Sequence, residues 1–245
     1  MLIYANPAEQ FKSYQSEIED AILSVIRGNS YILGKEVSAF EKEFASYIGT
    51  NSAIGVANGT NAIEIALRAL DIGIGDEVIT VSHTAVATVT AIEATGASAV
   101  LVDVEPDFYT LDPAQLNEVI TNKTKAVIVV DLFGNMPDYD AIKKVCDKYS
   151  ILMIEDSAES LGSVYKGTKA GKFGIGSVFS FHRTKTITTG EGGMLLIDDD
   201  DLFQRCKFLR DHGRQPGSYF NTEVTFKYMP FNVQAALGYA QFERI

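Results

Sequence analysis

Cysteine, histidine and basic residues are scarce in this sequence of 245 residues. The two cysteines and three histidines form neither a CxxC nor an HExxH pattern, so a disulfide scaffold, a zinc site and a metal enzyme are not expected. The 21 basic residues are outnumbered by 32 acidic ones, and the net charge of −11 argues against a nucleic-acid or anionic-membrane partner. Apolar runs of ~18 residues, the length of a membrane span, are missing, as is a basic segment followed by an apolar stretch at the start. We therefore expect a cytoplasmic protein without a bound metal.

What is present is the composition of an ordinary globular protein. Hydrophobic residues make up 46% of the chain and charged residues 22%, which excludes a disordered chain. The length corresponds to one large domain, or to one domain and a fragment, at the usual ~150 residues per domain.

Short apolar runs alternate with helical patterns through the middle of the chain. The runs lie at 52–58, 76–82, 98–104, 125–131 and 151–156, and the helical patterns between them at 61–70, 85–95, 112–121 and 138–149. Nearly continuous apolar strands separated by helices indicate an α/β fold with a parallel sheet covered on both faces. Ligands of such sheets bind beyond the carboxyl ends of the strands.

The two ends of the chain have different patterns. The first thirty residues are predicted to form one helix that stops at Gly28, and a second amphipathic helix precedes Gly49. Two further strands are predicted at 177–181 and 193–198, joined by a turn rich in Gly and Thr. The last stretch, FNVQAALGYAQFERI, is helical without a stop signal, so we expect a further domain beyond it.

Three of the predicted strand ends carry polar groups that suit chemistry. Asn58-Gly59-Thr60-Asn61 opens a helix, where it is either a simple N-cap or a phosphate cradle made of free backbone N–H groups. Asp156 ends a predicted buried strand, where a carboxylate needs a partner. It is either a structural residue, in a helix cap or an ion pair, or an anion that binds a metal or a protonated ring nitrogen.

The third strand end carries Lys185, in a turn between two core strands. It is either a solvated surface lysine or, in a shielded pocket, an amine nucleophile toward a carbonyl. A phosphate cradle, a carboxylate that pairs with a cation, and an amine at strand ends of one sheet are the three anchors of pyridoxal 5′-phosphate (PLP).

The segment EDSAESLGSVYKG…KFGIGSVFSFHRTKTITTGEGGMLL resembles the core of the DegT/DnrJ/EryC1/StrS sugar aminotransferases, and the similarity runs from about residue 7 to the end. The resemblance implies the three-layer α/β/α large domain of a fold-type-I PLP-dependent transferase, with a mostly parallel sheet and with the C-terminal small domain largely absent. It divides the chain into an N-terminal helical segment (1–30), a PLP-binding large domain (31–232) and the start of a helix leading to the small domain (233–245).

The resemblance also implies a role for each matching residue. Lys185 would form a Schiff base with PLP and then move a proton between substrate and cofactor. Asp156 would keep the pyridinium nitrogen protonated, and Glu159, at a position often Gln or His in relatives, would lie near the phenolic oxygen. The phosphate would be held by Gly59, Thr60, Asn61 and Ser180. Lys227 occupies a position that in relatives reaches into the site of the neighbouring subunit, which implies a homodimer.

One position departs from the family. Relatives commonly stack an aromatic side chain on the PLP ring from the segment that matches SHTAVAT, and Ala85 occupies that position here. His83 is therefore either the stacking side chain or an ordinary loop histidine.

The predicted activity is transfer of an amino group from L-glutamate to a keto-deoxyhexose carried on a nucleoside diphosphate, for amino-sugar biosynthesis. Whether the keto group is at C3 or C4 stays open, as does the nucleotide. A PLP-dependent sugar dehydratase and a PLP-binding regulator or inactive fragment are the alternatives. A dinucleotide-binding dehydrogenase is excluded because the sequence has no G-x-G-x-x-G after a predicted strand.

Overall fold

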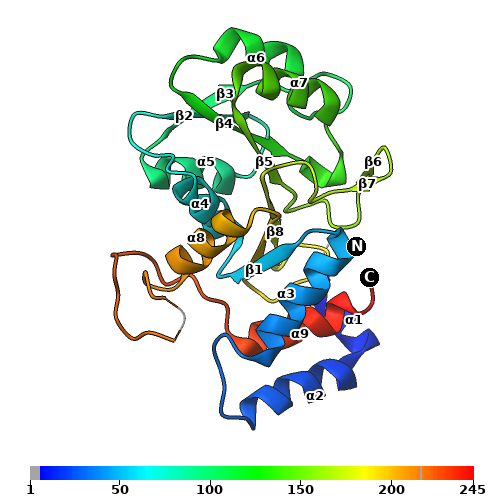
Figure 1. The fold of residues 1–245 in the computed structure, drawn as a ribbon. Helices are drawn as coiled ribbons and strands as arrows, with labels where there is room; N and C mark the ends of the chain where they lie inside the picture. Colours follow the sequence, from blue (N-terminus) through cyan, green and yellow to red (C-terminus); the bar gives the residue numbers. More distant parts are fainter. Residues whose placement is uncertain (1–5, 216) are drawn as a thin grey trace.

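A seven-stranded sheet forms the centre of the computed structural model, which describes residues 6–215 and 217–245 (Figure 1). The strand order is β1-β9-β8-β5-β4-β2-β3. The strands are β1 (Ser52–Val56), β2 (Glu77–Val81), β3 (Ser98–Val102), β4 (Thr124–Val130), β5 (Leu152–Asp156), β8 (Gly176–Ser180) and β9 (Gly193–Ile197). All neighbours pair in parallel except β9, which runs antiparallel to β1 and β8. The carboxyl ends of β1, β5 and β8 therefore meet at one edge, and the predicted mostly parallel α/β fold is confirmed.

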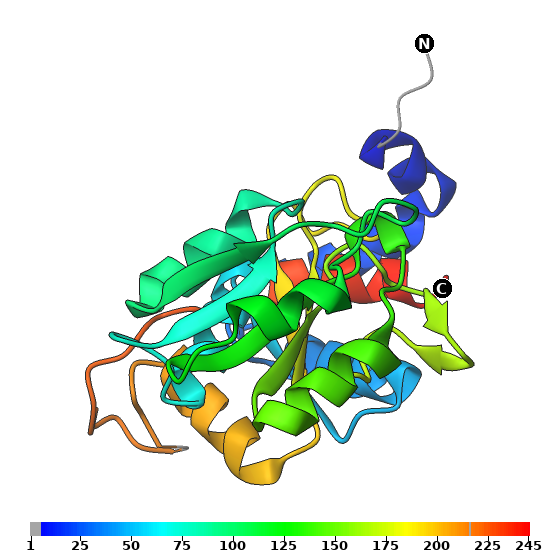
Figure 2. The same cartoon turned by 90° about the horizontal axis from the view of Figure 1, so that it is seen from above.

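The helices cover both faces of the sheet, as Figures 1 and 2 show. They are α3 (Lys35–Ile48), α4 (Gly59–Ala69), α5 (Val86–Thr95), α6 (Pro113–Val119), α7 (Tyr139–Tyr149), α8 (Asp200–Arg210) and α9 (Asn232–Phe242). Side chains alternate along β1: Ile54 packs with α4 and α8, whereas Ala53 packs with Phe44 of α3. The sheet is thus the middle of three layers.

The N-terminal segment differs from its prediction. Instead of one helix it forms α1 (Pro7–Ser13) and α2 (Gln15–Ile26), separated by Tyr14 at φ −148° and ψ 42°. The Tyr14 ring is buried with Ile18 and with Ala240 of α9. Burial of this ring requires a break that helical periodicity does not reveal. Residues 1–5 of the predicted segment lie outside the described residues.

Several short elements were not predicted: the 3-10 turn η1 (Leu132–Gly134), a hairpin of β6 (Val164–Tyr165) and β7 (Thr168–Lys169), and helix α8. Helix α9 packs on α2 and α3. In the described ranges, no helix is long and apolar enough to cross a membrane, and no group of three or more His, Cys, Asp and Glu side chains is placed to hold a metal.

Candidate functional site

The start of α4 lies against the end of β8. Asn58 caps the helix, and its side-chain oxygen accepts a hydrogen bond from the backbone N–H of Asn61 at 2.9 Å. A Cβ on Gly59 would lie 3.1 Å from Cβ of Ser180, so any larger residue would push Ser180 away by a few tenths of an ångström. The structure therefore brings Gly59 and Ser180 together as predicted. The N-cap is confirmed. The first-turn N–H groups of Gly59 and Thr60 have no partner inside the helix, which leaves the phosphate cradle as a compatible second role.

Asp156 ends β5 with only 5% of its surface exposed. Its Oδ2 accepts a hydrogen bond from the Thr88 hydroxyl at 2.9 Å, and its Oδ1 accepts one from the Ala158 N–H at 3.2 Å. Among the described residues, no cationic group forms a salt bridge with this carboxylate. Burial raises the pKa of the Asp156 carboxyl, and the hydrogen bonds from Thr88 and Ala158 oppose that rise. A cation placed next to Asp156 would offset the cost of burying its charge.

Thr88 is a site residue that the sequence did not reveal. It is fully buried in the first turn of α5, and its hydroxyl is also 2.9 Å from that of Thr84. Thr84 lies two residues before α5, and this contact brings its hydroxyl to the face of the helix that carries Thr88. Their spacing in SHTAVAT was the available signal, but nothing in the sequence shows that this face meets β5.

Lys185 is joined to Glu159 in a partly shielded ion pair. The Lys185 Nζ lies 2.8 Å from Glu159 Oε1, and the two side chains are 15% and 29% exposed. The other oxygen of Glu159 accepts a hydrogen bond from the Phe133 N–H at 3.1 Å. Burial alone would raise the pKa of Glu159, but the bonds from Lys185 and Phe133 outweigh it, and the net pKa is lowered.

The structure brings Asp156, Glu159 and Lys185 together, as predicted. The positive charge of Lys185 lowers the pKa of Asp156, although burial outweighs this effect. The surface-lysine alternative is wrong, because a shielded carboxylate holds the amine beside a buried acid.

His83 is exposed just beyond the end of β2. Its ring centroid lies 6.1 Å from that of Phe133 and 6.4 Å from that of Tyr109, both edge-on. Phe133 also bonds Glu159 through its backbone, so His83 lies near the same group of residues. Ala85 precedes α5 and is exposed. The stacking role of His83 stays a prediction.

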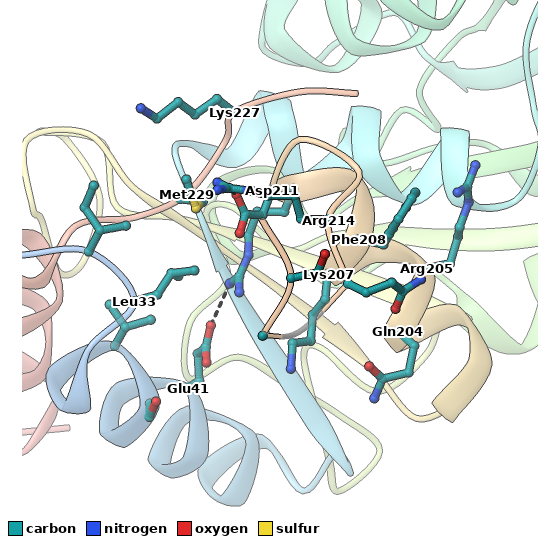
Figure 3. Close-up of a pocket in the computed structure, with 17 residues that line it drawn as sticks. Leu33, Glu41, Gln204, Arg205, Lys207, Phe208, Asp211, Arg214, Lys227 and Met229 are labelled. Carbon is teal, nitrogen blue, oxygen red and sulfur yellow. Dashed lines mark hydrogen bonds and ion pairs between the residues drawn. The ribbon is translucent and has the colours of Figure 1, made fainter. Parts of the chain in front are cut away.

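Lys227 lines a cavity of about 790 Å³ between α3 and α8, together with Arg210 and Arg214 (Figure 3). The dashed line in Figure 3 joins Glu41 to Arg210, at 2.9 Å, and the amine of Lys227 points away from Glu41. Asp156 and Lys185 are not among the described residues that line this cavity.

The arrangement suits one type of ligand. Helix-terminal N–H groups with Ser180 can hold an anionic tail, Asp156 can pair with a cationic nitrogen, and Lys185 offers an amine to a carbonyl. All three lie where β1, β5 and β8 end.

Comparison with known proteins gives one family. The model of the DegT/DnrJ/EryC1/StrS aminotransferase family matches residues 12–245. GDP-perosamine synthase from Caulobacter vibrioides is 44% identical over 214 residues, covering 87% of this chain and 58% of that protein. A pleiotropic regulatory protein from Geobacillus stearothermophilus is 36% identical and is covered to 64%. dTDP-3-amino-3,6-dideoxy-alpha-D-galactopyranose transaminase from Aneurinibacillus thermoaerophilus is 43% identical and is covered to 55%. The chain therefore spans less than two thirds of each of these relatives.

Solved structures of other proteins have the same fold as this chain. The crystal structure of S. venezuelae DesV in complex with a ketimine intermediate superposes with a TM-score of 0.95 at 34% identity, covering 99% of this chain and 66% of that one. The PLP form of "Putative sugar aminotransferase Spr1654" from Streptococcus pneumoniae gives a TM-score of 0.89 at 30% identity, covering 94% of this chain and 64% of that one. The fold-type-I architecture is thus confirmed.

Proposed function

The chain belongs to the DegT/DnrJ/EryC1/StrS aminotransferase family, and on this premise we propose that it is the cofactor-binding part of a PLP-dependent aminotransferase acting on a nucleotide-linked keto sugar. The observation that carries the proposal is the buried carboxylate of Asp156, which has no cationic hydrogen-bond partner among the described residues and lies beside the amine of Lys185. A protonated ring nitrogen supplies the missing positive charge.

The residues present fit PLP at each of its functional groups. When bound, PLP supplies an aldehyde that exchanges amino groups and a ring that accepts an electron pair. Gly59, Thr60 and Ser180 bind the phosphate, because backbone N–H groups at a helix start attract anions and Gly59 allows close approach. Asp156 would accept a hydrogen bond from the ring nitrogen and keep it protonated.

Lys185 performs the proton transfers. Its amine would hold the cofactor through the aldehyde carbon and, once free, would move a proton at the substrate carbon. General acid–base transfer of this kind contributes about 10²–10⁴-fold to a rate. Thr88 holds Asp156 in place through its hydroxyl, at 2.9 Å.

The substrates are proposed by class. L-glutamate is the amino donor, and the acceptor is a keto-deoxyhexose on a nucleoside diphosphate, in line with relatives named GDP-perosamine synthase and dTDP-3-amino-sugar transaminase. These names include different nucleotides, so the nucleotide and the choice of C3 or C4 remain open. The presence of Lys185 beside Asp156 favours transamination over a dehydratase without that lysine.

We also propose that the active form is a homodimer. Lys227 lines a cavity that neither Asp156 nor Lys185 lines, and three side chains of the preceding segment are almost fully exposed: Tyr219 at 91%, Phe220 at 82% and Val224 at 100%. A second copy of the chain would bury these apolar groups and receive Lys227 at its site. Light scattering of the purified protein tests the dimer. The cytoplasmic location stays a prediction, as does the division of the chain at 31 and 233.

The activity is tested by loading the protein with PLP and adding L-glutamate, then a panel of keto-sugar nucleotides. We expect glutamate to abolish the visible band of the bound cofactor and one keto-sugar nucleotide to restore it. Lys185→Ala should lose transamination while keeping the fold. Full activity of that variant would refute the proposal.

A further inference from the structure

Glu159 is fixed from three directions. Its Oε1 is 2.8 Å from the Lys185 amine, and its Oε2 accepts the Phe133 N–H at 3.1 Å. The turn that carries it is anchored on both sides of Glu159, because the Ser157 N–H donates to the Val178 carbonyl at 2.9 Å and the Ser160 hydroxyl donates to Asp131 Oδ2 at 2.9 Å. The carboxylate is therefore placed before any ligand arrives.

The backbone of Phe133 contributes to this placement. Phe133 has φ +58°, in the left-handed region that bulky residues rarely adopt, and its side chain is 79% exposed. The ring gains little burial in return for this conformation. What the conformation does is direct the backbone N–H toward Glu159.

From this geometry we infer that Glu159 is a counter-ion that binds the Lys185 ammonium directly and limits how fast its amine reacts with an aldehyde. The inference rests on the proposed function, because it concerns the lysine that would bond to PLP. An ammonium has no lone pair, so the ion pair must open before the nitrogen can attack. Glu159 is the direct partner of the amine, since Asp156, the other acid near Lys185, forms no hydrogen bond with it in the described residues.

The ion pair controls the reaction of Lys185 Nζ with an aldehyde carbon. A proton leaves Lys185 Nζ for Glu159 Oε1, and the electrons of the N–H bond become the lone pair of the amine. The lone pair forms the bond to the aldehyde carbon. The two hydrogens left on nitrogen and the aldehyde oxygen depart as water, and Glu159 returns its proton to solvent.

Reductive methylation with formaldehyde and cyanoborohydride tests the inference without PLP. The rate at each lysine is followed by peptide mass spectrometry on the full chain at one fixed pH. Because the pair is partly shielded, Glu159→Gln should raise the rate at Lys185 about three- to tenfold. Rates at the other lysines should stay unchanged, which separates a local effect from a loosened fold.

Two further variants complete the test. Glu9→Gln is the matched control, because Glu9 pairs with Lys12 at 2.6 Å on the surface, with both side chains 63% exposed; it should leave Lys185 unchanged. Glu159→Asp keeps the charge but shortens the side chain, so its rate should fall between those of the wild type and Glu159→Gln. Lys185 rates within about twofold of each other in all variants would overturn the inference.

Loading with PLP separates this inference from the proposed function. If PLP attaches, its visible band should develop faster in Glu159→Gln by a similar factor. A chain that shows the formaldehyde effect but never retains PLP would contradict the proposed function alone. If the chain retains PLP but the methylation rate at Lys185 is the same in Glu159→Gln as in the wild type, this inference alone would be contradicted.

Discussion

Glu155 and Asp156 are neighbours on β5, and their surroundings are opposite. Both are buried, at 0% and 5% exposure, and they point to opposite faces of the sheet. Glu155 accepts four hydrogen bonds from the described residues, at 2.6 to 3.0 Å: from the N–H groups of Gly171 and Phe173 and from the hydroxyls of Ser157 and Ser177. Asp156 accepts two, from Thr88 and Ala158.

The difference separates a structural acid from a functional one. Four donors replace most of the water that a carboxylate loses on burial, so Glu155 needs no further ligand. Two donors leave part of the Asp156 carboxylate without a partner, and its pKa is raised by burial. The strand thus places one acid that completes the fold next to one that awaits a cation.

The strongest test of this comparison is Asp156→Asn. An amide cannot hold a ring nitrogen in its protonated form, so we expect transamination to fall at least about a hundredfold, the effect of losing one partner of a buried charge pair worth about 3–5 kcal/mol. The free energy of unfolding of the cofactor-free chain should change by less than about 1 kcal/mol, because no buried charge remains to be desolvated. Steady-state kinetics and urea unfolding measure the two effects. Wild-type activity, or a chain that no longer folds, would contradict the distinction between Asp156 as a functional acid and Glu155 as a structural one.

Glu155→Ala should show the reverse pattern. Removing this side chain leaves Gly171, Phe173, Ser157 and Ser177 without their shared acceptor. We expect the free energy of unfolding to fall by about 3–4 kcal/mol, measured by urea denaturation. A loss below about 1 kcal/mol would mean that the four bonds contribute little, and that the two acids are not distinguished by their donors.

Thr88→Val sharpens the comparison by taking one of the two donors from Asp156. Valine has nearly the same shape, and a hydrogen bond to a charged group is worth about 1.5 kcal/mol, so activity should fall about tenfold. Thr90→Val, on the exposed side of the same helix, is the control and should keep its activity. Equal activities of the two variants would show that the Thr88 hydroxyl does not contribute to the site.

The last test concerns Asp131, an acid close to Glu155. Asp131 is fully buried, and burial and then the charge of Glu155 raise its pKa well above the usual range. The folded chain therefore binds this proton more tightly than the unfolded chain does. Its contribution to stability is present below the unfolded pKa of about 4 and is lost as the pH rises through the folded pKa.

Asp131→Asn should remove that dependence. The unfolding free energy of the wild type relative to the variant should decrease as the pH rises from 4.5 to 7.5, by at most about 1.4 kcal/mol per pH unit. Urea unfolding at several pH values measures the difference. A difference that grows with pH would contradict the raised pKa of Asp131.

Much of the fold followed from local patterns. The five early strands lie within one or two residues of their predicted ranges, because buried parallel strands such as Thr124–Val130 are nearly continuous apolar runs. Helix α3 ends where Gly49 adopts φ +90°, the conformation that made this glycine a stop signal. The break at Tyr14 could not be predicted, because its cause is contact with α9, more than two hundred residues away in the chain.

The site residues at strand ends could also be predicted from the sequence, whereas those that act through contacts between elements could not. Asp156, Glu159 and Lys185 could be named from strand ends and from the family resemblance. Thr88, Phe133 and the four donors around Glu155 could not, because their roles arise from contacts between elements. Whether His83 and Lys227 act on the cofactor also depends on partners that one chain does not contain.

The claim that Asp156 and Lys185 hold opposite parts of one PLP ring is tested most directly by mass spectrometry. The purified chain is incubated with PLP, reduced with borohydride and digested. We predict a mass increase equal to one reduced PLP on the peptide that contains Lys185, and a strongly reduced yield of that peptide in Asp156→Asn. Modification spread over surface lysines, or a yield that Asp156→Asn does not change, would contradict the account.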